Sequence, residues 1–181
     1  MSEGKIRGKI LVELWVTGKP MTIHELAEKV GFSSSSTMGY LLGLIKAKYV
    51  SVPQKQYYAI TNIGKQAIGL PNVDKNLAQN ILRSVALEKA FHFYHDVDLQ
   101  SGVYADSLKD FVDKLKIIDL NSIIFHLSRK DFENWSRSLG DLELSKKLGL
   151  VRTANISKEN LRNKLYQIVK SRYKELTKLT V

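Results

Sequence analysis

The sequence has no cysteine, only three prolines in 181 residues, and no apolar run long enough to span a membrane. Without cysteine the chain forms no disulfide bonds and performs no thiolate chemistry, which fits an intracellular, cytoplasmic protein. Its first residues are too polar and interrupted for a signal peptide, and we expect no membrane partner. Hydrophobic residues make up 44% of the chain, which is enough for a packed core and argues against global disorder.

Acidic residues are also few compared with basic ones. The chain has 18 Asp and Glu residues against 28 Lys and Arg residues, so its formal net charge is +10. A charge of this sign favours polyanionic partners, because basic side chains neutralise phosphate groups. We expect double-stranded DNA as the partner, with RNA or ribosome association as an alternative.

Residues 1–70 have the pattern of a small helical unit that ends in two short strands. A capping box at Thr22 and Glu25 predicts a helix start, and Gly31 predicts the end of the same helix. Thr61 is expected to cap the last helix of the unit. The predicted elements are helices over 5–16, 23–30, 34–47 and 62–68, with two strands in 49–60 around a polar turn at 53–56.

The rest of the chain divides into a connecting segment and a second domain. We assign residues 71–87 to the linker and connecting helix, and residues 88–181 to the domain. Apolar periodicity and caps indicate the following elements: a helix over 74–89, a strand in 90–97, a helix over 107–118, a strand over 122–127, and helices over 129–139, 142–149 and 156–176.

Three segments in the first 70 residues resemble a known family. They are TIHELAEKVGF, TMGYLLGLIKAKYV and QYYAITNIGKQAI, and the last is similar to the Y-x-L-T-x-x-G ending of winged-helix proteins. The order of elements resembles the winged helix-turn-helix of MarR- and PadR-like regulators and other archaeal winged-helix proteins. The expected fold is therefore mainly α-helical with a small β content: an N-terminal winged helix-turn-helix and a C-terminal α+β domain that ends in a long helix.

This resemblance implies a DNA-binding protein, either a transcriptional regulator or a nucleoid- or replication-associated factor. The helix over 34–47 would enter the major groove, and its start would present hydroxyl and amide groups to phosphate. We expect it to bury Met38, Leu41, Leu42 and Ile45. The expected nucleic-acid contacts are Ser33, Ser34, Ser35, Ser36, Thr37, Tyr40, Lys46 and Lys48, with Lys55 at the tip of the wing.

The same helix lacks the side chains that usually read bases. It has no arginine or asparagine, and Gly39 and Gly43 lie on its outward face, so we expect weak sequence specificity. The serines also have a purely structural interpretation, because serine is a good N-cap in any helix. A winged helix that contacts protein instead would make the chain an adaptor subunit, and this alternative stays open.

Residues 88–150 resemble a family known mainly from prokaryotic genomes as a domain of unknown function. The resemblance is carried by F-x-F-Y, S-L-K-D-F, F-H-L-x-R-x-D-F-x-N-W and L-G-D-x-E-L, and it implies no activity. The domain would supply dimerisation, partner docking or ligand sensing. Winged-helix regulators commonly dimerise through flanking helices, and the candidates here are residues 74–89 (from Asp74 to Lys89) and the C-terminal helix over 156–176.

Direct inspection of the second domain yields no catalytic motif, so we expect no enzyme and no cofactor. Histidines and aspartates suggest a metal site, but their spacing does not converge as metal ligands do; they are His92, His95, Asp96, Asp98, His126 and Asp131. We expect His126 to be a buried histidine in a strand, and the many aromatic residues to form the core. A base-stacking surface would require some of the FHFY residues to be exposed. The last helix has a basic stripe, which is either a solvated face or a second phosphate contact: Lys158, Arg162, Lys164, Lys170, Arg172, Lys174 and Lys178.

Overall fold

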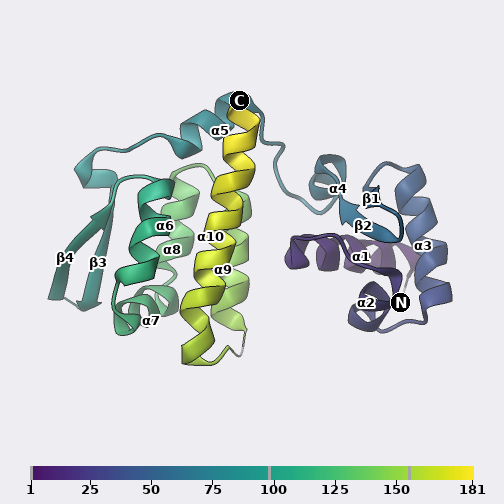
Figure 1. Ribbon diagram of the computed structural model, residues 1–181, viewed down its shortest axis with the longest axis horizontal. Helices are drawn as coiled ribbons and strands as arrows, with labels where there is room; N and C mark the ends of the chain where they lie inside the picture. The colour runs from purple at the N-terminus through teal and green to yellow at the C-terminus, as the bar shows by residue number, and fades with distance from the viewer. Residues whose placement is uncertain (1, 98, 155) are drawn as a thin grey trace. The chain divides into compact units, whose positions relative to one another are not determined.

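The computed structural model describes residues 2–97, 99–154 and 156–181. The chain forms two compact units, unit 1 over Met1–Asn72 and unit 2 over Val73–Val181 (Figure 1). Both are mainly helical, each contains a two-stranded antiparallel sheet, and the chain ends in a long helix. The predicted fold class, mainly α with small β elements, is confirmed at this level.

Unit 1 consists of three helices, a β-hairpin and a short fourth helix. β1 and β2 pair antiparallel with Val50 opposite Ile60, and Met21 adds a single bridge to Tyr58. This bridge connects the start of α2 to the hairpin through two backbone hydrogen bonds of 2.8 and 2.9 Å. The elements are α1 (Glu3–Thr17), α2 (Ile23–Val30), α3 (Ser34–Lys46), β1 (Val50–Gln54), β2 (Tyr57–Ile60) and α4 (Asn62–Ala67).

Local sequence signals explain where α2 and α4 begin and end. Thr22 and Glu25 form the predicted capping box, and Gly31 ends α2 with a positive φ of 77°. Thr61 caps α4, and its hydroxyl also donates a 2.7 Å hydrogen bond to the carbonyl of Lys48. The T-x-x-G segment therefore ties α4 to the chain that leaves α3.

The core of unit 1 differs from the expected core at one helix position. Leu41 and Leu44 of α3 are buried, whereas the side chain of Leu42 is 59% exposed. The prediction that Leu42 faces inward is therefore wrong. Leu42 is one helical step of 100° beyond Leu41, and this step moves it onto the solvent side because α1 and α2 cover only one face of α3.

Unit 2 contains a hairpin, a short 3-10 helix and six α-helices among the described residues. Figure 1 shows the hairpin at one edge and α10 along the packed helices; α10 contacts α5, α6, α7 and α9. The elements are α5 (Lys75–Leu82), η1 (Leu87–Lys89), β3 (Phe91–Asp96), β4 (Leu99–Ala105), α6 (Leu108–Ile117), α7 (Leu120–Ser128), α8 (Asp131–Ser138), α9 (Leu142–Thr153) and α10 (Lys158–Thr180).

The structure corrects two predicted elements of unit 2 and adds one strand. Residues 122–127 are helical within α7, because Asp119 caps this segment and its buried residues Ile123, His126 and Leu127 follow helical spacing. The helix expected over 74–89 ends at Leu82, and strand β4 over residues 99–105 was not predicted. The run of β-branched and aromatic residues in α7 has the composition of a strand, which explains the error.

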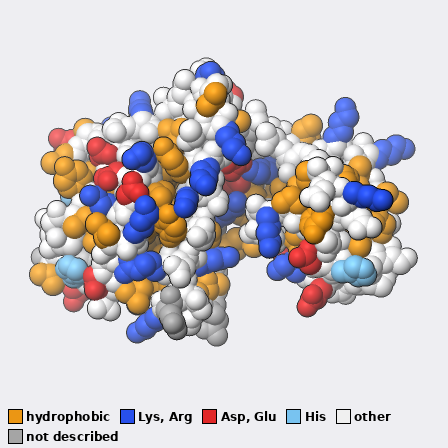
Figure 2. All heavy atoms as spheres, viewed as in Figure 1, with side chains coloured by type: hydrophobic (Ala, Val, Ile, Leu, Met, Phe, Trp, Pro, Cys, Tyr) orange, Lys and Arg blue, Asp and Glu red, His pale blue; other side chains and the backbone are white. Residues whose placement is uncertain are grey.

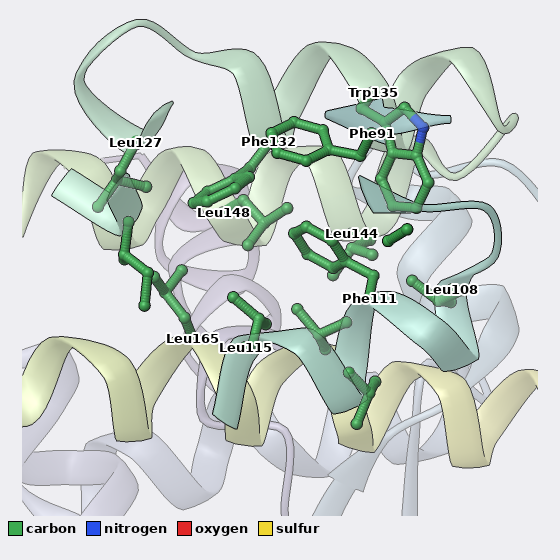
Figure 3. Packing of buried hydrophobic residues seen from close by; sticks show 14 of the residues in the cluster. Phe91, Leu108, Phe111, Leu115, Leu127, Phe132, Trp135, Leu144, Leu148 and Leu165 are labelled. Atoms are coloured by element: carbon green, nitrogen blue, oxygen red, sulfur yellow. The ribbon is translucent and has the colours of Figure 1, made fainter. Parts of the chain in front are cut away.

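Aromatic rings fill the centre of unit 2 (Figure 3). Phe91, Phe93, Phe111, Phe132 and Trp135 are buried, as predicted, and their ring centroids lie 4.9–6.5 Å apart, mostly edge to face. The apolar face of α10 closes this core through Leu161, Leu165, Val169 and Leu176. Because this stripe packs within its own unit, it is not free to pair with a second copy.

Arg172 of α10 is buried, which corrects its place on the predicted basic stripe. Its guanidinium is bonded to Asp141 by two hydrogen bonds of 2.8 and 3.0 Å and to Glu143 by one of 2.8 Å. Burial lowers the pKa of Arg172, but the hydrogen bonds and charge of Asp141 outweigh this effect and raise it. Arg172 therefore links α10 to the start of α9.

The helices described in the structure include none that combines the length and the apolar character needed to cross a bilayer.

Candidate nucleic-acid interface

The start of α3 is exposed and is organised by its own serines. Ser33 is the N-cap, and its hydroxyl accepts a 3.2 Å hydrogen bond from the amide of Ser36. Ser34 Oγ lies 3.1 Å from Nδ1 of His24 on α2. The structure therefore shows the N-cap role that we considered for the serines. The exposed Ser35 adds a hydroxyl to a helix start whose N–H and O–H groups can donate hydrogen bonds to a phosphate oxygen.

Two of the expected contact residues face the interior of unit 1. The side chain of Thr37 is completely buried, and its hydroxyl has no hydrogen-bond partner among the described residues. Thr37 cannot contact a nucleic acid from this position, so its assignment to the interface is corrected. Tyr40 is half-buried and packs against the core of unit 1. Both residues lie on the side of α3 that the core of unit 1 covers.

The three expected lysines are exposed, and they lie at three different places. Lys46 is in the last turn of α3, and Lys48 follows the helix with a positive φ of 62°. Lys48 thus adopts the left-handed conformation that glycine tolerates best. Lys55 lies with Gln56 in the two-residue turn of the hairpin, where Gln54 pairs with Tyr57. The three lysines therefore lie in the last turn of α3, between α3 and β1, and in the β1–β2 turn.

An arginine from α1 lies beside α3, although sequence reasoning did not include it. A Cβ built on Gly43 would be 3.4 Å from Nη2 of Arg7. The same guanidinium makes a 2.6 Å ion pair with Glu3, and the Arg7 side chain is 46% exposed. A guanidinium from another helix therefore lies at van der Waals distance from α3 at Gly43.

A second missed signal is the distribution of acidic residues. The 45 residues between Glu28 and Asp74 contain no aspartate or glutamate, but they contain five lysines. They include α3, the hairpin and α4. This part of unit 1 therefore presents positive charge without an intervening carboxylate, and the charge pattern alone would have identified it.

The basic stripe of unit 2 is smaller than the sequence suggests. Figure 2 shows Lys and Arg side chains along α10 on the face in view. Arg162 donates a 2.8 Å hydrogen bond to the carbonyl of Leu115, and Lys170 lies 5.0 Å from the ring centroid of Tyr166. The exposed members are Lys158, Lys164, Lys174 and Lys178.

The described histidines and aspartates of unit 2 include one close pair, His126 and Asp131. The described residues contain no group of three or more His, Asp or Glu side chains placed to hold a metal ion, and Asp98 lies outside the described residues. His126 is buried, as expected, but it belongs to a helix and has two partners. Its Nδ1 lies 2.8 Å from Asp131, and its Nε2 accepts a 2.8 Å hydrogen bond from the amide of Tyr94.

These two partners fix the protonation of His126. A backbone amide can only donate, so Nε2 carries no proton and Nδ1–H donates to the carboxylate of Asp131. Burial lowers the pKa of His126, and this effect exceeds the opposite effect of Asp131. With both nitrogens occupied, His126 joins β3 to α7 and α8 and has no nitrogen available for proton transfer to a substrate.

The alternating pattern of FHFY is resolved by the hairpin. Phe91 and Phe93 point into the core, whereas His92 and Tyr94 are half-buried on the opposite side. Tyr104 of β4 is 46% exposed, and its ring centroid lies 5.9 Å from that of His92. A base-stacking surface requires partly exposed rings, and His92, Tyr94 and Tyr104 have them.

Comparison with known proteins identifies one family. The model of a family of unknown function (DUF5752) matches residues 47–170, which begin directly after α3 and include the hairpin, α4 and most of unit 2. No winged-helix family is identified. No curated protein has a significant match to the chain. No solved structure has one either. Since the match covers about two thirds of the sequence and includes the predicted segment 88–150, the chain belongs to the DUF5752 family of unknown function.

Proposed function

We propose that the chain binds double-stranded DNA through unit 1, whose element order resembles a winged helix-turn-helix. α3 would lie in the major groove, and the β1–β2 turn with Lys55 would lie along the backbone or minor groove. The observation that carries the proposal is the acid-free segment between Glu28 and Asp74, which contains α3, the hairpin and α4. A chain segment that contains lysines and no carboxylates favours a polyanionic partner.

The proposed binding is mainly to phosphate. The outward face of α3 offers Ser35, Gly39, Leu42 and Lys46, and this set contains no arginine, asparagine or glutamine that could read a base edge with two hydrogen bonds. Arg7 and Lys46 can neutralise phosphates, and the serine hydroxyls can hydrogen-bond to them. We therefore propose weak sequence preference, as in a nucleoid- or replication-associated factor or a regulator with a permissive operator.

The test is a gel-shift series with duplex DNA, single-stranded DNA and RNA of equal length. We expect the duplex to bind most tightly, and the double variant Lys46→Glu/Lys48→Glu to weaken all duplex sequences alike. The matched control is Lys5→Glu/Lys19→Glu, which makes the same charge change at exposed positions of the same unit, outside the acid-free segment. Unchanged duplex binding by the α3 variant, or an equal loss with the control, would show that this surface is not the contact.

A protein adaptor is the second candidate, and Leu42 is the observation that favours it. Its side chain is 59% exposed in the middle of the outward face of α3, where a duplex offers few apolar groups. In this case the chain purified from its own cells would retain one stoichiometric protein partner. Leu42→Glu would release that partner, whereas a DNA-binding chain would lose only duplex affinity.

A homodimer, if the regulator forms one, would use surfaces other than the apolar stripe of α10. That stripe and the buried residues of α5, Ala78 and Ile81, belong to the core of unit 2. Light scattering measures the state directly: twice the chain mass at micromolar concentration supports the dimer, and a single chain mass removes it.

A further inference from the structure

Unit 2 has a cleft between β3 and the turn that joins α7 to α8. Its volume is about 410 Å³, which lies within the range of small-molecule sites. Tyr94 and Phe125 supply partly exposed aromatic rings, the buried Phe91 borders the cleft from the core, and Arg129 and Asp131 supply charged groups. The cleft therefore combines flat apolar surfaces with one hydrogen-bond donor group and one acceptor group.

The buried side chain of His126 holds the acceptor, Asp131, in place. His126 donates to Oδ2 of Asp131 at 2.8 Å, and His126 is itself fixed by the amide of Tyr94. The side chain of Asp131 is 30% exposed, and its other oxygen, Oδ1, accepts no hydrogen bond from the described residues. A carboxylate that is oriented by a buried histidine and has one free oxygen is prepared to accept hydrogen bonds from a ligand.

The donor is positioned beside this carboxylate. Arg129 Nε lies 3.5 Å from Asp131 Oδ2, and the guanidinium carbon lies 5.0 Å from the ring centroid of Phe125. The Arg129 side chain is 54% exposed, and its terminal nitrogens have no hydrogen-bond partner within the described chain. A guanidinium stacked on an aromatic ring keeps its in-plane donors directed away from that ring.

The charge of the cleft limits the ligand. Among the described lining residues Arg129 is the one arginine or lysine, whereas Asp96 and Asp131 are both acidic, so a phosphate group gains little from entering. Aromatic walls favour a flat ring. Because Asp131 accepts hydrogen bonds and the neighbouring Arg129 donates them, the edge of the ligand ring must offer a donor to Asp131 beside an acceptor for Arg129.

We infer that this cleft binds a guanine nucleoside through its base. The N1–H and 2-amino groups of guanine would both donate to Oδ1 of Asp131, because Oδ2 is occupied by His126 and Arg129. The O6 of guanine would accept from a terminal nitrogen of Arg129, while the ring lies against the aromatic walls. Adenine offers a single donor group on the same edge, and cytosine offers a single donor group beside two acceptors, so both satisfy Asp131 less well. Any phosphate on the ligand would stay in solvent. The inference does not depend on DNA binding by unit 1.

The test is a titration of the full chain with guanosine, followed by amide chemical shifts in ¹H–¹⁵N spectra. We expect saturable shifts at Tyr94 and Arg129, and affinity for inosine, which lacks the 2-amino group, about tenfold weaker because one hydrogen-bonding group is lost. Adenosine and cytidine should bind at least about tenfold more weakly as well. Guanosine that produces no saturable shift would overturn the inference.

Two variant pairs assign the effect to named groups. Asp131→Asn keeps an oxygen for His126 but replaces the other acceptor with an amide donor, and Arg129→Ala removes the donor without disturbing a buried contact. Both should weaken guanosine by about tenfold or more. The controls, Asp113→Asn on α6 and Arg137→Ala on α8, should leave it unchanged. Equal affinity for guanosine, inosine, adenosine and cytidine, or wild-type affinity in Arg129→Ala, would show that bases bind by nonspecific stacking on the aromatic rings. Either result would also contradict the inference.

Discussion

The guanidinium of Arg7 lies against Gly43, so that a Cβ on the glycine would be 3.4 Å from Arg7 Nη2. A helix that has no arginine of its own therefore has one at its border, supplied by α1. This 3.4 Å separation is an ordinary van der Waals distance, so the guanidinium lies directly on the surface of α3 at this glycine. This relationship adds a cation to the proposed interface that periodicity on α3 does not reveal.

Replacement of Arg7 by glutamine should weaken duplex binding. One phosphate contact is lost, so the slope of log affinity against log salt should become shallower by about one. Fluorescence anisotropy with a labelled duplex measures this slope. Lys5→Gln is the control, since it removes one charge from another face of the same helix. If both variants change the slope equally, Arg7 makes no specific contact.

Gly64 should not tolerate alanine. A Cβ at this position would lie 2.2 Å from the carbonyl oxygen of Tyr49 and 2.8 Å from Ile60. We expect Gly64→Ala to lower the free energy of unfolding of unit 1 by about 3 kcal/mol, because the backbone must move. Gly39→Ala meets nothing within 4 Å and lies in a helix, so it should raise the stability by about 0.5–1 kcal/mol. Amide hydrogen exchange in unit 1 measures both changes, and equal effects would contradict the account.

Unit 2 should lose stability in mild acid. Burial lowers the pKa of His126 below its ordinary value of 6.5, so the unfolded chain binds more protons than the folded chain below pH 6.5. The free energy of unfolding should then fall as the pH falls from 6.5 toward the folded-state pKa, by at most about 1.4 kcal/mol per pH unit. Urea denaturation of unit 2 at several pH values measures this loss.

The control for this pH dependence is His24→Gln, which removes an exposed histidine of unit 1 and should leave unit 2 unchanged. The physical reason for the loss is geometric, because a protonated Nε2 would face the amide hydrogen of Tyr94. Constant stability between pH 7 and 5 would mean that His126 accepts no hydrogen bond from this amide.

Arg172 should be needed for the stability of unit 2. Its removal leaves Asp141 and Glu143 buried without their main partner, so Arg172→Met should cost about 3–5 kcal/mol. Lys174→Met, an exposed change on the same helix, should cost less than about 0.5 kcal/mol. Thermal unfolding compares the two variants. A loss below about 1 kcal/mol for Arg172→Met would show that the network stabilises little.

Local signals in the sequence predict much of the fold. Helix ends can be identified from the capping box at Thr22, the glycine at position 31 and the cap at Thr61. Their hydrogen bonds join residues within four or five positions of one another, so a short stretch of sequence contains the whole signal. The fold class and the aromatic core follow from composition and periodicity. Apolar runs are harder to assign: residues 122–127 have strand composition, but the cap at Asp119 and the packing of α7 against β3 and α8 favour a helix.

The interface is less accessible to sequence reasoning because it depends on contacts between distant residues. Ser33 is found as a cap from its own neighbourhood, but the burial of Thr37 depends on how α3 is rotated against α1 and α2. Arg7 is 36 positions away from Gly43, so no helical repeat connects them. The cleft beside Asp131 likewise combines a strand with a helix turn that lies more than thirty residues further along the chain.

The most direct test of the central claim is the affinity of the chain for a labelled duplex across a salt series, for the wild type and for Lys46→Glu/Lys48→Glu. The account predicts tight binding at low salt that falls steeply with salt, by at least about tenfold between 50 and 200 mM. It also predicts a shallower slope in the variant and little dependence on duplex sequence. Affinity that is independent of salt, or the same slope in both proteins, would contradict phosphate binding by the acid-free surface of unit 1.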